Sequence, residues 1–129
     1  MSYIYADVDN LQGTSKVGTK QCVALLQHYA GLPRTAEWSE GQVVIGTQTI
    51  AKGTAIATFV NGSYQSLGTG NHAAFFISQD AGGMWIMDQW SSDTSKPTVS
   101  KRYIAKKGKH TSGTFVDPSN NANAYSVIE

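Results

Sequence analysis

Apolar residues follow a helical spacing most clearly between positions 20 and 30. Within that window they recur at intervals of three, four and seven residues, which places them on one face of a helix. These residues are Cys22, Leu25, Leu26 and Tyr29. Thr19 precedes the window as a candidate N-cap, and Gly31 with Pro33 supplies stop signals at the other end. The pattern predicts a helix over residues 20–30.

After position 41 the pattern changes to short apolar runs separated by glycine-containing turns, which is typical of β-strands. The expected strands cover residues 42–45, 54–60, 72–79, 84–90, 101–104 and 124–128. Because one helix comes first and no further helix alternates with the strands, this order predicts an α+β fold with an antiparallel sheet. We expect the helix to pack on about five to six strands, in a single domain over residues 1–129.

Composition and charge exclude several classes of function. The chain has 129 residues, of which 40% are hydrophobic, enough for one packed core. Ten basic and nine acidic residues leave a net charge of +1, so we expect neither nucleic acid nor a membrane surface as a partner. Five basic residues gather in 101–110. That run favours a solvated face, and a local patch for an anionic partner is the alternative.

The N-terminus has neither the basic region nor the apolar region of a secretory signal. No apolar stretch approaches the ~20 residues that span a bilayer. We therefore expect the protein to be made in the cytoplasm without a signal peptide.

The chain holds a single cysteine, Cys22. A lone thiol forms no internal disulfide, and with three histidines it cannot complete a thiolate zinc site without carboxylates, so we expect no metal and no cofactor. Cys22 lies in the first turn of the predicted helix, where free amides and the helix dipole stabilise a thiolate. The same amides can stabilise the oxyanion that forms when sulfur attacks a carbonyl. A small buried apolar residue is the alternative interpretation.

A nucleophilic cysteine needs a base, which is most often a histidine held by a third polar group. His28 lies on the same helix, roughly opposite Cys22, and His110 lies among lysines in an expected loop. His72 begins an expected strand after a glycine-rich loop and is the best of the three. Asp88 is a carboxylate within an otherwise apolar strand, where an ionised group needs a partner.

The hairpin between these strands determines whether His72 and Asp88 can meet. A three-residue loop over 80–82 would pair Gln79 with Gly83. That register places His72 and Asp88 on one face as diagonal neighbours, about 7 Å apart at the backbone. A two-residue loop would send Asp88 to the opposite face, so the prediction depends on the turn.

Four short motifs occur in an order that resembles a known superfamily. They are Gln21-Cys22 at a helix start, Gly53-Thr54 opening a strand, Gly70-Asn-His72-Ala-Ala-Phe-Phe-Ile77, and Asp88-Gln-Trp90. With this order and spacing, residues 15–90 and the closing strand look like a papain-like amidase of the CHAP and NlpC kind. The chain is similar, more narrowly, to small type VI secretion amidase effectors. Many relatives carry Gly-Asp where this chain has Gly53-Thr54.

The resemblance implies a function and a role for each site residue. Cys22 would be the nucleophile, His72 the base, Asp88 the residue that orients it, and Gln21 a support for the oxyanion. Four aromatic residues are candidates for a substrate cleft, with core packing as their alternative role. They are Trp38, Tyr64, Trp85 and Trp90.

The expected activity is hydrolysis of amide bonds in the peptide stems of peptidoglycan, in the periplasm or outside the cell, after dedicated secretion or lysis. Delivery by secretion would imply a cognate immunity protein as a partner. Two alternatives stay open. One is a non-catalytic cell-wall binding module of the same fold, and the other is a transglutaminase or deamidase acting on protein glutamine.

Overall fold

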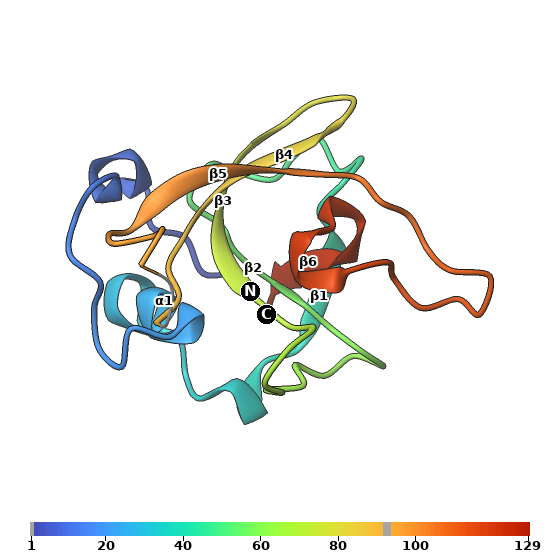
Figure 1. The fold of residues 1–129 in the computed structure, drawn as a ribbon, viewed down its shortest axis with the longest axis horizontal. Helices are drawn as coiled ribbons and strands as arrows, with labels where there is room; N and C mark the ends of the chain where they lie inside the picture. The colour runs from blue at the N-terminus through green and yellow to red at the C-terminus, as the bar shows by residue number, and fades with distance from the viewer. Residues whose placement is uncertain (1, 92–93) are drawn as a thin grey trace.

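The computed structural model describes residues 2–91 and 94–129, which form one α-helix, four 3-10 turns and a six-stranded sheet (Figure 1). The helix is α1 (Cys22–Ala30), and the strands are β1 (Glu40–Val43), β2 (Ala55–Thr58), β3 (Ala73–Gln79), β4 (Gly83–Asp88), β5 (Ser100–Ala105) and β6 (Tyr125–Ile128). The 3-10 turns are η1 (Val8–Leu11), η2 (Thr35–Glu37), η3 (Pro118–Asn120) and η4 (Ala122–Ala124). The predicted α+β fold is confirmed.

The strand order in the sheet is β1-β6-β2-β3-β4-β5, and all neighbours are antiparallel. The last strand of the chain, β6, therefore lies between the first two. The pattern along the chain contains no signal for this order, because each run shows only that a strand forms and not which strand it pairs with. Among the described residues, no helix is both long and apolar enough to cross a membrane.

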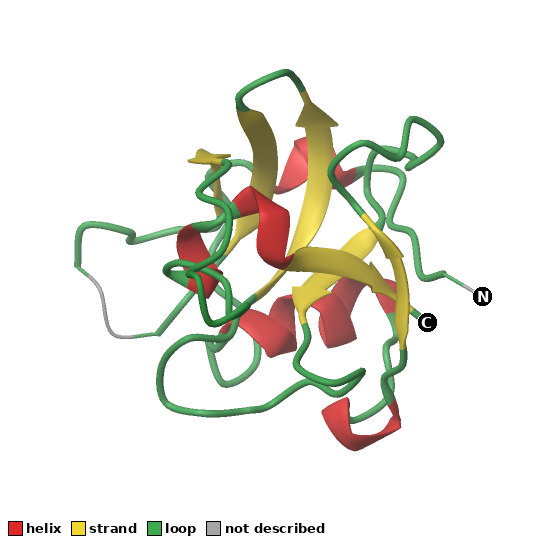
Figure 2. Cartoon of the chain, turned by 90° about the vertical axis from the view of Figure 1, so that its right-hand side faces the viewer, coloured by secondary structure: helices red, strands yellow, loops and turns green. Residues whose placement is uncertain are grey.

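Alternate residues of the central strands bury two separate apolar clusters, one on each face of the sheet. Ala55 and Phe75 belong to the cluster that also contains Leu25 and Leu26 of α1. Ile56, on the other face, belongs to the cluster that contains Ala122 of η4. Figure 2 shows helical segments on both sides of the twisted sheet. The strands are thus covered on both faces, which holds their ends in place.

The start of α1 differs from its prediction. Lys20 adopts a positive φ of 69°, and the extended residue Gln21 serves as N-cap without a capping side-chain hydrogen bond. Thr19 is therefore not the N-cap, and the helix begins at Cys22 itself. At the other end Gly31 has φ 68° and donates its N–H to the Gln27 carbonyl, which confirms the predicted stop. The shorter helix leaves Cys22 in its first position.

Counted by the pairing of the strands, the turn between β3 and β4 has two residues, Ala81 and Gly82, and not the three expected. The Asp80 N–H donates to the Gly83 carbonyl at 2.9 Å, and Gln79 pairs with Met84. The predicted pairing of Gln79 with Gly83 is therefore wrong. Taken alone, this turn would reverse the face on which the far half of β4 presents its side chains.

A β-bulge in β3 restores the predicted register at the other end of the hairpin. Ile77 is an extra residue on β3, because the pairing shifts by one residue on its two sides. Beyond the bulge Phe75 pairs with Met87, as the predicted register requires. His72 and Asp88 consequently come together, although the reason differs from the expected one.

Candidate active site

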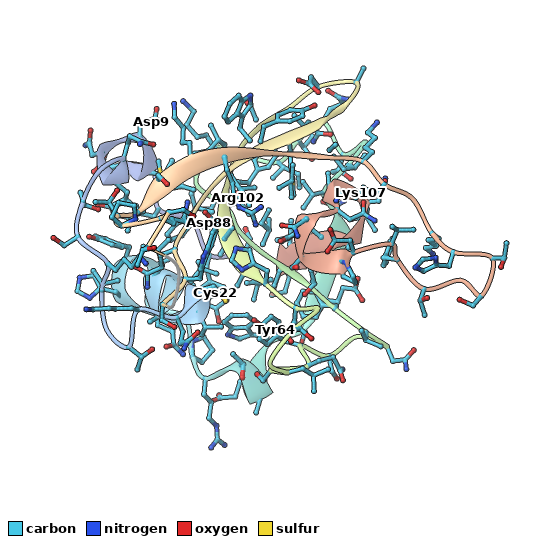
Figure 3. All side chains as sticks on the ribbon, viewed as in Figure 1. Asp9, Cys22, Tyr64, Asp88, Arg102 and Lys107 are labelled. Carbon is cyan, nitrogen blue, oxygen red and sulfur yellow. The ribbon has the colours of Figure 1, made fainter. Side chains whose placement is uncertain are left out.

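Three ends of secondary structure meet at the candidate active site. Cys22 is the first residue of α1, His72 directly precedes β3, and Asp88 is the last residue of β4. In Figure 3 the labels of Cys22 and Asp88 lie near the centre of the molecule, between those of Arg102 and Tyr64. The structure thus brings together the three residues that the sequence predicted as a catalytic triad.

His72 is held on both sides of its ring. Its Nε2 lies 2.7 Å from Asp88 Oδ2, and the two side chains are 8% and 0% exposed. Because Nε2 is engaged, Nδ1 is the ring nitrogen left for the hydrogen bond with Cys22. The backbone N–H of His72 also donates to the Thr58 hydroxyl at 3.0 Å. These contacts determine the position of the imidazole relative to the sulfur.

The environment of Cys22 favours its thiolate. Burial raises the pKa of the thiol, but the hydrogen bond and charge of His72, with the Tyr64 hydroxyl and the Ala73 backbone, lower it overall. The Tyr64 hydroxyl lies 3.6 Å from the sulfur. Burial alone would also lower the pKa of His72, yet the hydrogen bonds and charges of Asp88 and Cys22 raise it to about 9. Both shifts favour a thiolate beside an imidazolium.

Asp88 is the centre of a buried charge cluster. Besides His72, it contacts Lys96 Nζ at 2.8 Å through Oδ1 and Arg102 Nε at 2.8 Å through Oδ2. Burial raises the pKa of its carboxyl group, but His72, Arg102 and Lys96 together hold it well below its usual range. Asp88 therefore stays ionised, and its partners hold it in one orientation.

A buried glutamine connects the strand that carries Asp88 to the start of α1. Gln89 is fully buried, and its Oε1 accepts the Val17 N–H at 3.0 Å. Its Nε2 donates to the carbonyls of Val17 and Gln21, at 3.1 and 2.8 Å. Gln21 in turn donates its side-chain amide to the Ser91 hydroxyl at 2.9 Å. The segment after β4 thus holds the helix start beside His72.

Two hollows meet at Cys22 and His72. One, of about 510 Å³, is lined by Cys22, Gln21 and Tyr64, and the other, of about 340 Å³, by His72 and Trp90. Gly68 and Asn71 line both. The arrangement suits a chain-like substrate that crosses Cys22 and His72.

The predicted cleft aromatics divide into two groups. Tyr64 lines the hollow beside Cys22, and Trp90 lines the hollow beside His72. Trp38 lines neither: it is 5% exposed, its ring lies 4.9 Å from that of Tyr64, and its indole N–H donates to the Pro33 carbonyl. Trp85 also lines neither hollow. It is 42% exposed, and its ring packs against that of Tyr103. Trp38 supports Tyr64 from behind and is not a cleft residue.

Comparison with known proteins identifies the family. A family model described as domesticated amidase effector 2 matches residues 2–128. Over 133 aligned residues the chain is 50% identical to the type VI secretion amidase effector 2 protein of Salmonella typhi, with 100% of each covered. The chain belongs to the amidase effector 2 family.

A second member of the amidase effector 2 family, domesticated amidase effector 2 of Ixodes scapularis, is 39% identical over 93 residues, which cover 67% of this chain and 63% of that protein. A solved structure of type 6 secretion amidase effector 2 matches with a TM-score of 0.92 and 50% identity, covering 98% of this chain and 94% of the other. The resemblance to type VI secretion amidase effectors is confirmed.

Three residues of the site carried no prediction. Lys96 lies in a polar loop, and Gln89 was noted only as part of a motif. Arg102 belongs to the basic run 101–110, which is otherwise mostly exposed as expected, but its side chain is only 24% exposed. One signal in the sequence could have distinguished Arg102 from the other basic residues. Successive side chains of a strand point to opposite faces, so every second residue of β5 lies on the face of the sheet that carries Asp88.

Among the described residues, no group of three or more His, Cys, Asp or Glu side chains is placed to hold a metal ion. Thr54, the position at which the sequence motif departs from the Gly-Asp of the resemblance, is buried and donates its hydroxyl to the Ala51 carbonyl at 2.7 Å. That departure from the superfamily pattern therefore lies outside the site.

Proposed function

We propose that this protein is a cysteine amidase that hydrolyses amide bonds in the peptide stems of peptidoglycan. The observation that carries the proposal is the chain of contacts from Cys22, at the start of α1, through His72 to Asp88. Membership of a family of amidase effectors supports the reaction class. Peptidoglycan is the substrate that the sequence resemblance implies.

The reaction begins with attack of the Cys22 thiolate on the carbonyl carbon of the amide. The first-turn amides of α1, beginning with that of Cys22, are placed to stabilise the oxyanion. Tyr64 is a further donor: its oxygen accepts from Asn71 Nδ2 at 3.1 Å, which leaves the hydroxyl proton for the sulfur or the oxyanion. Burial and the neighbouring Cys22 raise the pKa of Tyr64 well above its usual range, so the hydroxyl keeps that proton.

His72 moves the proton in both halves of the reaction. As an imidazolium it donates to the leaving amine, and as an imidazole it then takes a proton from the water that attacks the acyl-enzyme. The free acid leaves, and the thiolate–imidazolium pair is restored. Asp88 stabilises the imidazolium and keeps Nδ1 directed at the sulfur. Gln21 acts as a positioning residue at the start of α1, and Trp90 borders the substrate.

The name of the Salmonella typhi relative supports delivery by type VI secretion. We therefore propose that the protein acts in the periplasm of a target cell after delivery by that machinery. An enzyme that attacks the wall of related cells requires protection of the producer. We therefore also propose a cognate immunity protein that covers the two hollows.

The test is digestion of purified sacculi by the wild-type protein, followed by mass spectrometry of the released muropeptides. We expect products that identify one stem-peptide bond, and no products from Cys22→Ala or His72→Ala. Products from folded Cys22→Ala would refute the mechanism. Sacculus binding without products would indicate a binding module, and ammonia release from a protein substrate without muropeptide products would indicate a deamidase.

A further inference from the structure

The two hollows at the candidate active site differ in charge. Among the described residues that line the hollow beside Cys22, none has a charged side chain apart from the thiolate itself. The lining of the hollow beside His72 contains, besides the imidazolium of His72 itself, the guanidinium of Arg102. A ligand that occupies both hollows therefore meets a fixed positive charge on one side only.

Among the described residues, the charges in contact with Asp88 do not balance. Cys22 and His72 form a neutral pair once the thiol has given its proton to the imidazole, and Asp88 then supplies one negative charge against the two positive charges of Lys96 and Arg102. One positive charge remains in excess. The side chain of Lys96 is 6% exposed and that of Arg102 is 24% exposed, so the excess charge reaches solvent at Arg102.

Arg102 also has hydrogen-bond donors to spare. Its Nε donates to Asp88 at 2.8 Å, its Nη1 to the Asn120 side chain at 2.9 Å, and its Nη2 to the Ser119 carbonyl at 3.4 Å. A guanidinium carries five N–H groups. Two of the five therefore have no partner among the described residues. Since Arg102, Asn120 and Ser119 all line the hollow, a ligand there can reach them.

The direction of the reaction determines which part of a substrate lies in this hollow. The carbonyl carbon must lie over the Cys22 sulfur, and the amide nitrogen must lie within reach of the proton that His72 returns. The amine-side residue therefore extends into the hollow beside His72. We propose that Arg102 binds a free carboxylate on that amine-side residue and so selects the bond that is cut. This inference rests on the proposed amidase function.

The test compares two substrates that differ only at that carboxylate. Both are the stem-peptide fragment that contains the bond identified by muropeptide digestion, one with the amine-side residue as the free acid and one with it as the carboxamide. We expect wild-type kcat/KM to be at least about tenfold higher for the free acid, the scale of a hydrogen bond to a charged group. Equal values would overturn the proposal.

Two variants test Arg102 itself. Because Arg102 also holds Asp88, Arg102→Gln will slow both substrates, and only the ratio of their kcat/KM values reports on the carboxylate. We expect that ratio to fall to about one. Asn120→Asp leaves the contact between Arg102 and Asp88 in place and adds a competing carboxylate at an exposed position. The ratio should fall there too, even if Arg102→Gln does not fold.

Lys109→Gln is the matched control, because it also removes one positive charge. Lys109 belongs to the same basic run as Arg102, but its Nζ lies 4.8 Å from the centre of the Phe115 ring and it does not line the hollow. Its substrate ratio should equal that of the wild type, and a fall as large as in Arg102→Gln would contradict a specific subsite. If the wild type cleaves neither fragment nor sacculi, the proposed function fails and this inference fails with it. If it cleaves both fragments equally, the amidase function stands and Arg102 serves only to hold Asp88.

Discussion

The two ends of the hairpin formed by β3 and β4 each carry an aspartate with several polar partners. At the turn, Asp80 Oδ1 accepts the backbone N–H groups of Gly82 and Gly83, at 2.8 and 3.0 Å, and the Tyr103 hydroxyl at 2.7 Å. Those contacts and the charge of Lys106 hold the pKa of Asp80 below its usual value, although a small burial effect opposes them. Asp80 is exposed, so water competes for every one of these contacts.

At the site end of the hairpin, Asp88 makes contacts of similar length, to His72, Lys96 and Arg102, but it is fully buried. Burial removes water from the carboxylate and from its partners, so each depends on the others for its stability. The distance of a contact alone therefore does not measure how much a carboxylate contributes to the structure around it. The exposed aspartate shapes a turn, and the buried one holds His72 in place.

The same substitution at the two ends gives the sharpest test of this difference. Asp88→Asn leaves Lys96 and Arg102 without their counter-charge and removes the negative charge that stabilises the His72 imidazolium. The amide can also donate to His72, where the carboxylate only accepts, so the ring is no longer held in one tautomer. We expect activity on sacculi to fall by about 10³- to 10⁴-fold and the free energy of unfolding to fall by about 3–5 kcal/mol. Initial rates and urea unfolding measure the two effects. A loss of activity below about tenfold would mean that Asp88 does not orient the base.

A second variant at the buried end tests the connection between Gln89 and the helix start. Gln89→Leu removes all three of its hydrogen bonds and leaves the backbone groups of Val17 and the Gln21 carbonyl without them. We expect a loss of about 2–3 kcal/mol in unfolding free energy. Activity should fall by roughly 10- to 100-fold, mainly in kcat, because a displaced nucleophile is poorly aligned with His72. An unchanged kcat in the folded variant would contradict this positioning role.

The pH dependence of the wild type gives a third, smaller effect. Because the pKa of His72 is raised from 6.5 to about 9, its contribution to stability is fully present below pH 6.5 and is lost as pH rises through about 9. We expect kcat/KM to fall over the same upper range, since the imidazolium that protonates the leaving amine disappears. In Asp88→Asn, which lacks the carboxylate that raises this pKa, the fall should begin at lower pH. A profile identical to that of the wild type would count against the coupling.

Asp80→Asn should have the smallest effect of all. An asparagine side-chain oxygen can still accept from Gly82 and Gly83, and the lost charge is exposed to solvent. We expect wild-type activity, a wild-type pH profile and only a slight fall in melting temperature. A marked loss of activity would show that the turn communicates with the site, and the contrast between the two aspartates would no longer hold.

The sequence predicted those parts of the site that local patterns encode. The helical spacing around Cys22 and the glycine-rich loop before His72 placed both residues at the ends of elements. Asp88 was identified because a carboxylate within an apolar strand needs a partner. Each inference used only neighbouring positions and the physical cost of burial.

The missed parts depend on contacts between distant segments. Lys96 and Arg102 reach Asp88 from a loop and from the edge strand β5, and a basic residue in either place looks like a solvated one. The position of β6 between β1 and β2 is likewise a matter of pairing and not of pattern. The bulge at Ile77 left no signal because its residues are as apolar as their neighbours.

The bulge at Ile77 makes two distant lengths of chain interdependent. Eleven residues separate Phe75 from Met87, an odd number, so a turn of two residues lets these two pair only if one residue of a strand stays unpaired. A three-residue turn without a bulge uses the same number of residues and gives the same register at the site. The hairpin can therefore exchange one solution for the other without any insertion or deletion, and the pairing of Phe75 with Met87, not the form of the turn, keeps His72 beside Asp88.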